Sequence, residues 1–209
     1  FDGSPRNNIV RLNSNGIIDC SFVYNDATAL VRDIEVRSGG KIVLAGFFNN
    51  VVQGVNSGIV KLNSDGSYDQ TAVGSGATGT VTRIIPYTDG SLKAMIVGSF
   101  TNYNGTPINR IARINDDGSL DTSFNPGTGA NSTVWDVALM PNTQMYVGGA
   151  FTSFNAAANT VRIVRLNSSG TLDVNFSSGT GTGFNGSVFA LSYEPPAEKV
   201  LVGGLFNSY

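Results

Sequence analysis

One short phrase, in which aliphatic residues surround a basic residue and an asparagine follows, recurs through the whole chain. It is Ile-Val-Arg-Leu-Asn or a close variant, and successive copies begin 50, 52 and 52 residues apart. A glycine and an aspartate follow each copy. The copies begin at Ile9, Ile59, Ile111 and Ile163, with glycines at Gly16, Gly66, Gly118 and Gly170 and aspartates at Asp19, Asp69, Asp121 and Asp173. A period of about 50 residues indicates a repeat architecture.

Two further patterns recur in step with this phrase. One is Gly-x-Phe and the other is valine with an aliphatic residue three positions later. The first ends at Phe48, Phe100, Phe151 and Phe206, and the second begins at Val31, Val81, Val134 and Val188. Short runs rich in Val, Ile and Phe between turn residues predict strands, and no segment shows a sustained helical period. Each repeat is therefore predicted to form four antiparallel strands, which is typical of a β-propeller blade.

The two ends of the chain predict how the blades are divided. The last residues, written ahead of the first ones, match the internal stretch 99–111, and the step around this join is 55 residues. We therefore predict an all-β, four-bladed propeller in one domain, with residues 201–206 paired to residues 9–12 so that no edge stays open. The alternative is a piece of a longer array. The predicted blades are 29–73, 80–125, 133–177, and 186–209 together with 1–23.

The repeated motif resembles a known family. Arg-Ile-Asn-Asp-Asp-Gly-Ser-Leu-Asp-Thr-Ser-Phe, residues 113–124, is similar to the delta-60 repeat of bacterial and phage proteins. The second copy departs from the motif, because Tyr68 replaces an aliphatic residue and no phenylalanine follows Asp69. The resemblance implies a β-propeller of largely unknown function from a secreted bacterial surface protein or a phage structural protein. An extracellular or virion location is the corresponding expectation.

Composition narrows the possible chemistry. The chain has no histidine, one cysteine (Cys20), 13% charged residues and a net charge of −2. Histidine is the commonest general base and metal ligand, so we expect no metal site and no cofactor. The charge pattern predicts no nucleic-acid partner, and no apolar run is long enough to predict membrane insertion.

The turn after each repeated phrase has two interpretations. Alternating oxygen side chains before the glycine, as in residues 115–121, could bind calcium. The copies at Asn15, Asp65, Asp117 and Ser169 carry few charges, so a hairpin turn is favoured. A three-residue loop with a left-handed glycine would place the basic residue of each phrase opposite its aspartate. We therefore predict positive φ at the four glycines and an ion pair in each unit. Gly-rich stretches such as Gly127-Thr128-Gly129 are interpreted as flexible connections between blades.

The first strand of each blade should line the central channel. Its charged residues are Asp33, Glu35, Arg83 and Asp136. Paired carboxylates there could serve glycoside hydrolysis, although lining of a wet channel is the simpler interpretation. Trp135 and Phe189 occupy one equivalent position, where they could stack on a sugar or pack between blades.

The loops between the second and third strands are long and differ in sequence, as recognition loops on a rigid scaffold often do. Their aromatic and amide groups suit partly apolar, partly hydrogen-bonded contacts. The candidate ligand-binding residues are Tyr103, Asn104, Phe154, Asn155 and Tyr209. The favoured function is a non-enzymatic phage tail or fibre domain that binds a host-surface protein or glycan, or other virion proteins. The alternatives are a secreted bacterial adhesin and a carbohydrate-active enzyme that uses channel carboxylates.

Overall fold

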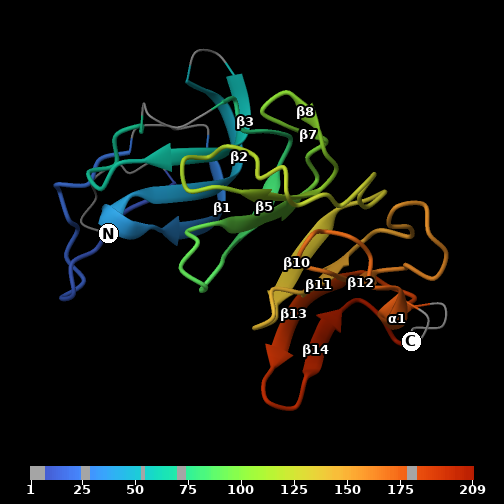
Figure 1. Cartoon of the computed structure of the whole chain (residues 1–209). Helices are drawn as coiled ribbons and strands as arrows, with labels where there is room; N and C mark the ends of the chain where they lie inside the picture. The colour runs from blue at the N-terminus through green and yellow to red at the C-terminus, as the bar shows by residue number, and fades with distance from the viewer. Residues whose placement is uncertain (1–7, 25–28, 53–54, 70–73, 178–182) are drawn as a thin grey trace.

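One antiparallel arrangement repeats three times along the chain (Figure 1). The computed structural model describes residues 8–24, 29–52, 55–69, 74–177 and 183–209. In each of three sheets a central strand pairs with the strand before it and with a later one. The strands are β1 (Leu30–Val36), β2 (Ile42–Val52) and β3 (Val55–Leu62) in unit 1, β5 (Val81–Pro86), β6 (Ala94–Gly98) and β9 (Ile111–Ile114) in unit 2, and β10 (Val134–Leu139), β11 (Met145–Gly149) and β12 (Ile163–Leu166) in unit 3.

An incomplete unit lies at each end of this series. β13 (Val188–Glu194) and β14 (Lys199–Gly204) pair with each other to form a C-terminal hairpin. Residues 8–24 form an N-terminal hairpin, in which Leu12 and Ile18 make a single bridge. The C-terminal hairpin corresponds to the first two strands of a unit. The N-terminal hairpin corresponds to the repeated phrase of a unit and the glycine turn that follows it.

The predicted pairing between residues 201–206 and residues 9–12 is absent from the described part of the chain. β14 pairs with β13 alone, and Leu201 is 63% exposed. The N-terminal hairpin packs instead against unit 1, where Ile9 and Phe22 join a cluster with Leu44. The two hairpins therefore lie apart (Figure 1). The units form an arc whose ends do not meet, so the predicted closed ring is not observed.

The predicted fourth strand of each unit is also shorter than expected. It joins its sheet through one bridge, such as that between Ile114 and Leu120. The repeated aspartate ends it: Asp121 Oδ1 accepts hydrogen bonds from the backbone N–H and the hydroxyl of Ser123, and the Phe124 N–H bonds to the Asp121 carbonyl. This side-chain turn curls the backbone away from the ladder. In unit 3 the same segment continues as the one-turn helix α1 (Val174–Ser177).

The turn that precedes this segment agrees with the prediction. Gly16, Gly66, Gly118 and Gly170 have φ values of 82°, 90°, 91° and 91°. In the first copy Asn13 N–H bonds to the Ile17 carbonyl, which leaves three residues in the loop. Ion pairs form between Arg11 and Asp19, Arg113 and Asp121, and Arg165 and Asp173. The fourth predicted pair is replaced, because Asp69 binds Lys41 at 2.6 Å and Lys61 reaches unit 2.

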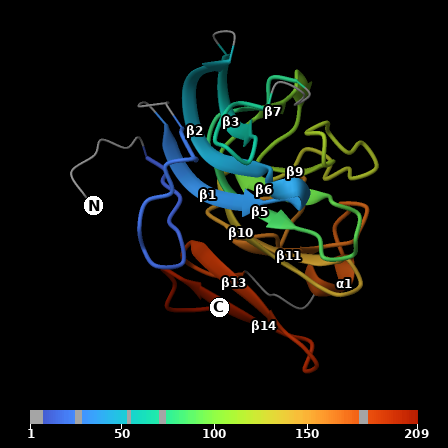
Figure 2. The ribbon, with the colours of Figure 1, turned by 90° about the vertical axis from the view of Figure 1, so that its left-hand side faces the viewer.

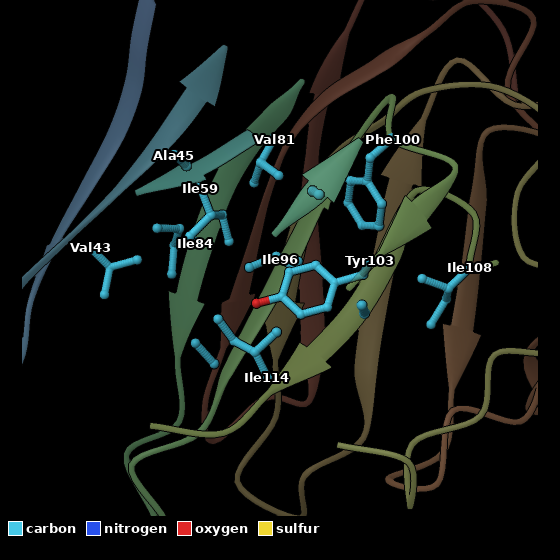
Figure 3. Close-up of a cluster of buried hydrophobic side chains, with 13 residues drawn as sticks. Val43, Ala45, Ile59, Val81, Ile84, Ile96, Phe100, Tyr103, Ile108 and Ile114 are labelled. Atoms are coloured by element: carbon cyan, nitrogen blue, oxygen red, sulfur yellow. The ribbon is translucent and has the colours of Figure 1, made fainter. Parts of the chain in front are cut away.

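The hydrophobic core lies between neighbouring units. Alternate residues of a strand point to opposite faces, so β6 directs Ile96 toward unit 1 and Met95 toward unit 3. Figure 3 shows the first of these clusters, in which Val43 of unit 1 and Ile84 and Ile96 of unit 2 lie together. The central strands are consequently buried on both faces. Within the described residues, no helix is long and apolar enough to cross a membrane.

Polar contacts repeat at the same junctions. The first strands of successive units, β1, β5, β10 and β13, lie side by side (Figure 2). The basic side chain of each of the first three phrases also donates to the backbone carbonyl of the residue that follows the phrase of the next unit. These contacts join Arg11 to Ser64, Lys61 to Asp116, and Arg113 to Ser168. One interface is thus used three times in succession.

Candidate functional site

Two of the predicted ligand-binding residues belong to the core. Tyr103 is 1% exposed and Phe154 is fully buried. The Tyr103 hydroxyl donates to the Gly118 carbonyl at 2.7 Å, and its ring lies among the apolar residues of Figure 3. Burial raises the pKa of this hydroxyl well above its usual range, so it remains a donor. Neither side chain is exposed to a ligand in this structure, because each loop folds back and inserts its aromatic ring into the junction.

The neighbouring amides fix the shape of these loops. In unit 2, β7 (Asn102–Tyr103) pairs with both β4 (Ala77–Thr78) and β8 (Thr106–Pro107). Asn104 follows β7 with φ of 48°, and its Oδ1 accepts the Gly76 N–H at 2.7 Å.

In unit 3, Asn155 has φ of 53° and accepts the Gly129 N–H at 3.0 Å. The two loops are therefore built alike despite their different sequences. Their amides hold the connection from the preceding unit, so the Gly127-Thr128-Gly129 stretch is fastened to Asn155.

Tyr209, the last predicted residue, is in a different environment. It occupies the position of Tyr103 in the repeat but is 63% exposed. Its ring lies 4.6 Å from that of Phe184, at an interplanar angle of 44°. Among the described residues, no third strand or glycine turn packs against this position as it does in unit 2, and the ring is left exposed.

An open groove lies beside these loops, between units 2 and 3. Its volume is about 290 Å³. One wall comes from the end of the unit 2 loop and the other from the connection that follows, with the unit 3 loop at its margin. The lining residues are Asn109, Arg110, Thr128, Gly129, Ala130, Asn131, Ser153 and Ala156.

Hydrogen bonds across the groove hold its walls in place. Asn109 Nδ2 donates to the Thr128 carbonyl at 3.0 Å, and Arg110 Nη1 donates to the Ala130 carbonyl at 2.9 Å. On the other side, Asn131 Oδ1 accepts the backbone N–H of Ser153 at 3.1 Å. The result is a fixed concave surface in which amide, hydroxyl and guanidinium groups stand among apolar atoms, so that a ligand can make both hydrogen bonds and apolar contacts there.

No sequence pattern predicted this groove. Asn109 and Arg110 end a loop in which only Tyr103 and Asn104 were predicted to bind a ligand, and Thr128 and Gly129 lie in a stretch that was interpreted as a flexible connection. Arg110 has φ of +67°, and Arg162, at the same repeat position, has +68°. Such values are uncommon for a residue with a side chain. The recurrence of Arg at this position is the one signal that the sequence offered.

The charged residues of the first strands form a structural network. Arg83 lies between two carboxylates: Nε is 3.4 Å from Asp33 Oδ2, and Nη1 is 3.4 Å from Asp136 Oδ1. Asp33 also accepts the Ile84 N–H at 2.9 Å, and Asp136 accepts the Leu191 N–H at 2.8 Å. Each carboxylate therefore fastens its strand to the next unit.

The electrostatics of this network follow from burial. Asp136 is 3% exposed, and desolvation raises its pKa although the Leu191 N–H and Arg83 oppose that shift. Desolvation also raises the pKa of Glu35. A general acid or base must have its proton within reach of a substrate. Asp136 instead directs both oxygens at protein groups, at Val137 N–H and Arg83 through Oδ1 and at Leu191 N–H through Oδ2.

Two other predicted positions have structural contacts. Trp135 and Phe189 meet edge to face, with centroids 5.8 Å apart, so they pack across the junction between β10 and β13. In the turns, Asp117 Oδ1 accepts the Ser119 N–H at 2.8 Å, and Asp65 binds Ser67 in the same way. No cluster of three or more Cys, Asp or Glu side chains that could hold a metal occurs in the described ranges.

Comparison with known proteins agrees with the repeat structure. A family model described as a domain of unknown function (DUF5122), beta-propeller, matches residues 1–22, 38–71, 88–124 and 142–176. Each matched segment ends shortly after the glycine turn and its aspartate. A search of curated proteins finds no match. The matched segments cover more than half of the chain and include all four copies of the phrase, and the chain belongs to the DUF5122 beta-propeller family.

Proposed function

We propose that this protein is a non-enzymatic recognition module that binds a glycan in the groove between units 2 and 3. The observation that carries the proposal is the groove itself, whose walls are fixed by the hydrogen bonds of Asn109, Arg110 and Asn131. Sugars present many hydroxyl groups, and a prearranged set of donors and acceptors binds them with little loss of conformational freedom.

The absence of an enzymatic role is part of the proposal. Its support is the use of the Asp33 and Asp136 carboxylates as ties between units. A glycosidase needs two carboxyl groups that flank the scissile bond. Here Arg83 lies within 3.4 Å of both side chains.

The biological setting follows from the repeat. We propose that the module is displayed outside the cell or on a virion, as part of a phage tail or fibre, and that a secreted bacterial adhesin is the alternative. The resemblance to the delta-60 repeat supports this setting. The genes adjacent to the one that encodes this chain test it: tail or assembly genes support the phage, and a surface-sorting signal supports the adhesin.

Glycan-array binding of the parent and of two variants tests the groove. Asn109→Ala and Arg110→Ala remove groups from the wall, and each should weaken binding about tenfold or more because a lost hydrogen bond to a charged or amide group costs about 1–3 kcal/mol.

Arg162→Ala is the matched control. This arginine has the same repeat position and positive φ, and it donates to the Ala150 carbonyl outside the groove. Circular dichroism should show that all three variants are folded. Unchanged binding by the folded groove variants, or equal loss in the control, would show that the site lies elsewhere.

A further inference from the structure

The groove between units 2 and 3 carries a single kind of charge. Arg110 is the charged member of its lining, and the remaining lining residues are neutral. The ion pairs of the described residues do not include Arg110. A guanidinium cannot be deprotonated in a protein. The groove therefore presents a positive charge to which no described residue supplies the counter-ion, and such a surface attracts a ligand of the opposite sign.

The Arg110 side chain is held in a fixed direction. Its backbone N–H donates to the Phe100 carbonyl at 2.9 Å, and its backbone carbonyl accepts the Gly98 N–H at 3.0 Å. At the far end of the side chain, Nη1 donates to the Ala130 carbonyl at 2.9 Å. Arg110 is therefore tied at both ends across the wall of the groove, and little conformational freedom remains to be lost when a ligand binds.

The other N–H groups of this guanidinium are available to a ligand. Within the described part of the chain, Nη1 makes the one side-chain hydrogen bond of Arg110. Neither Nε nor Nη2 is among the buried atoms without a partner, so both reach the surface. Nε and Nη2 present parallel N–H groups along one edge of the guanidinium, and that edge matches the two oxygens of a carboxylate.

The side-chain amides of the lining hold the walls together. Asn109 Nδ2 donates to the Thr128 carbonyl at 3.0 Å. Asn131 Nδ2 donates to the Thr152 hydroxyl at 2.9 Å, and Asn131 Oδ1 accepts the Thr152 N–H at 2.9 Å. Both amides thus have structural partners. The guanidinium of Arg110, whose hydrogen bonds are strengthened by its charge, is the main donor left for a ligand.

The equivalent arginine of unit 3 has the same backbone but a different side-chain environment. The Arg162 N–H donates to the Phe151 carbonyl at 2.9 Å, and its carbonyl accepts the Gly149 N–H at 2.9 Å. Its Nε, however, is buried without a partner, and its Nη1 donates to the Ala150 carbonyl. The repeat therefore fixes the backbone at this position, whereas the accessible guanidinium edge belongs to the groove.

We propose that the groove binds the carboxylate of an acidic sugar, such as a hexuronic acid, through the Nε–Nη2 edge of Arg110. This inference rests on the proposed glycan-binding function and narrows it to one class of glycan. The sugar ring presents hydroxyl groups to Ser153 and C–H groups to Ala156, both of which line the groove. A volume of about 290 Å³ is at the small end for a ligand site and suits one acidic sugar residue rather than a long segment of a glycan.

Titration of the parent chain with glucuronate and with glucuronamide separates charge from shape. The two sugars have nearly the same size, but the amide is neutral. Backbone amide chemical shifts followed by NMR should show that glucuronate binds about tenfold more tightly, with the shifts centred on residues 109, 110, 128–131 and 153. Added salt should weaken the binding of glucuronate and leave that of glucuronamide nearly unchanged.

Three variants assign the preference to one guanidinium. Arg110→Gln keeps hydrogen-bond donors without the charge and should bind the two sugars equally. Arg110→Lys keeps the charge without the planar fork and should retain only part of the preference. Arg162→Gln is the matched control and should behave as the parent. The NMR spectra of the variants report whether each one is folded.

The outcomes distinguish this inference from the broader function. Equal affinity of the parent for glucuronate and glucuronamide overturns the carboxylate proposal and leaves glycan binding standing. Binding of neither sugar also overturns it, and the glycan array then decides separately whether the broader function holds. A preference for glucuronate that survives in folded Arg110→Gln places the carboxylate elsewhere. Inorganic sulfate that binds as tightly as glucuronate would show that the groove takes any anion, which also contradicts the assignment to a sugar acid.

Discussion

Unit 2 and the C-terminal hairpin share a sequence pattern, but their side chains are buried to very different extents. Met95, Phe100 and Tyr103 of unit 2 are at most 1% exposed. Their equivalents in the hairpin include Leu201 and Tyr209, and both of these are 63% exposed. The difference does not lie in the strands, since β5 pairs with β6 as β13 pairs with β14, with a bulge at the same place. In unit 2 the third strand, the glycine turn and the next unit cover these side chains. No described residues cover their equivalents in the hairpin in this way.

This comparison shows that a unit of this fold is not a self-sufficient core. Each sheet buries its faces against its neighbours, so a missing neighbour exposes residues in a strand that is otherwise correctly paired. Repeat proteins derive their stability from such nearest-neighbour interfaces. The effect of a substitution should therefore depend on the place of its unit in the series.

Phe100→Ala and Phe206→Ala should show the largest difference. Phe100 is fully buried between units 1 and 2, and its truncation should lower the free energy of unfolding by about 3–5 kcal/mol. Phe206 has the same repeat position but is half-buried and packs on Phe184, so the cost should be clearly smaller. Urea denaturation of both variants at low protein concentration measures it. Equal costs for both variants at low concentration would show that Phe206 is already in a complete core.

Gly170→Ala and Gly16→Ala should differ by a smaller amount. Both glycines have positive φ, which costs a residue with a side chain about 1–2 kcal/mol. At Gly170 a Cβ would also lie 2.8 Å from the backbone carbon of Asn125 in the preceding unit, whereas at Gly16 nothing lies within 4 Å. Gly170→Ala should therefore lower the melting temperature more. Equal losses would mean that the contact with Asn125 can relax without cost.

The sequence predicted what depends on local chemistry. The period, the order of the strands and the left-handed glycine turns all follow from short-range preferences, and three of the four predicted ion pairs formed. The fourth did not form because Lys61 directs its single ammonium group to the Asp116 carbonyl of the next unit, whereas Arg11 and Arg113 reach both partners with separate nitrogens. The fourth strands are shorter than predicted, because the hydrogen-bonding turn of the aspartate overrides the strand propensity of its neighbours.

The candidate site was harder to predict. Tyr103 and Phe154 belong to loops, where aromatic residues often contact partners, but these loops fold back onto the junction. The available clue was that Tyr103 and Phe154 occupy equivalent positions in the repeat. Phe can replace Tyr at a position where the aromatic ring packs in a core and the hydroxyl group is not required. The groove joins residues from a loop and a connection that are 20 residues apart, and only the packing of two units brings them together.

The smallest predicted difference concerns acid titration of two equivalent aspartates. Hydrogen bonds from Ser21 and then Arg11 lower the pKa of Asp19 from 3.8 to about 2. Burial alone would raise the pKa of Asp121, but hydrogen bonds from Lys93, Ser123 and Arg113 lower it further still. A carboxyl group with a lowered pKa in the folded state stabilises the fold above its unfolded pKa, and that contribution is lost as pH falls through the folded value.

Both aspartates should therefore contribute stability above about pH 4 that disappears on acidification, and Asp19 should lose its part first. Carboxyl carbon chemical shifts followed by NMR from pH 5 down to about pH 1.5 would give the Asp19 midpoint and show whether Asp121 stays ionised further into acid. Lys93→Gln introduces the residue that unit 3 carries at this position, Gln144. It should raise the titration midpoint of Asp121 toward that of Asp19, because Lys93 is an ion-pair partner for which Asp19 has no equivalent. An unchanged Asp121 midpoint in this variant would show that Arg113 and Ser123 alone set its acidity, and that the missing lysine does not distinguish the N-terminal hairpin from unit 2.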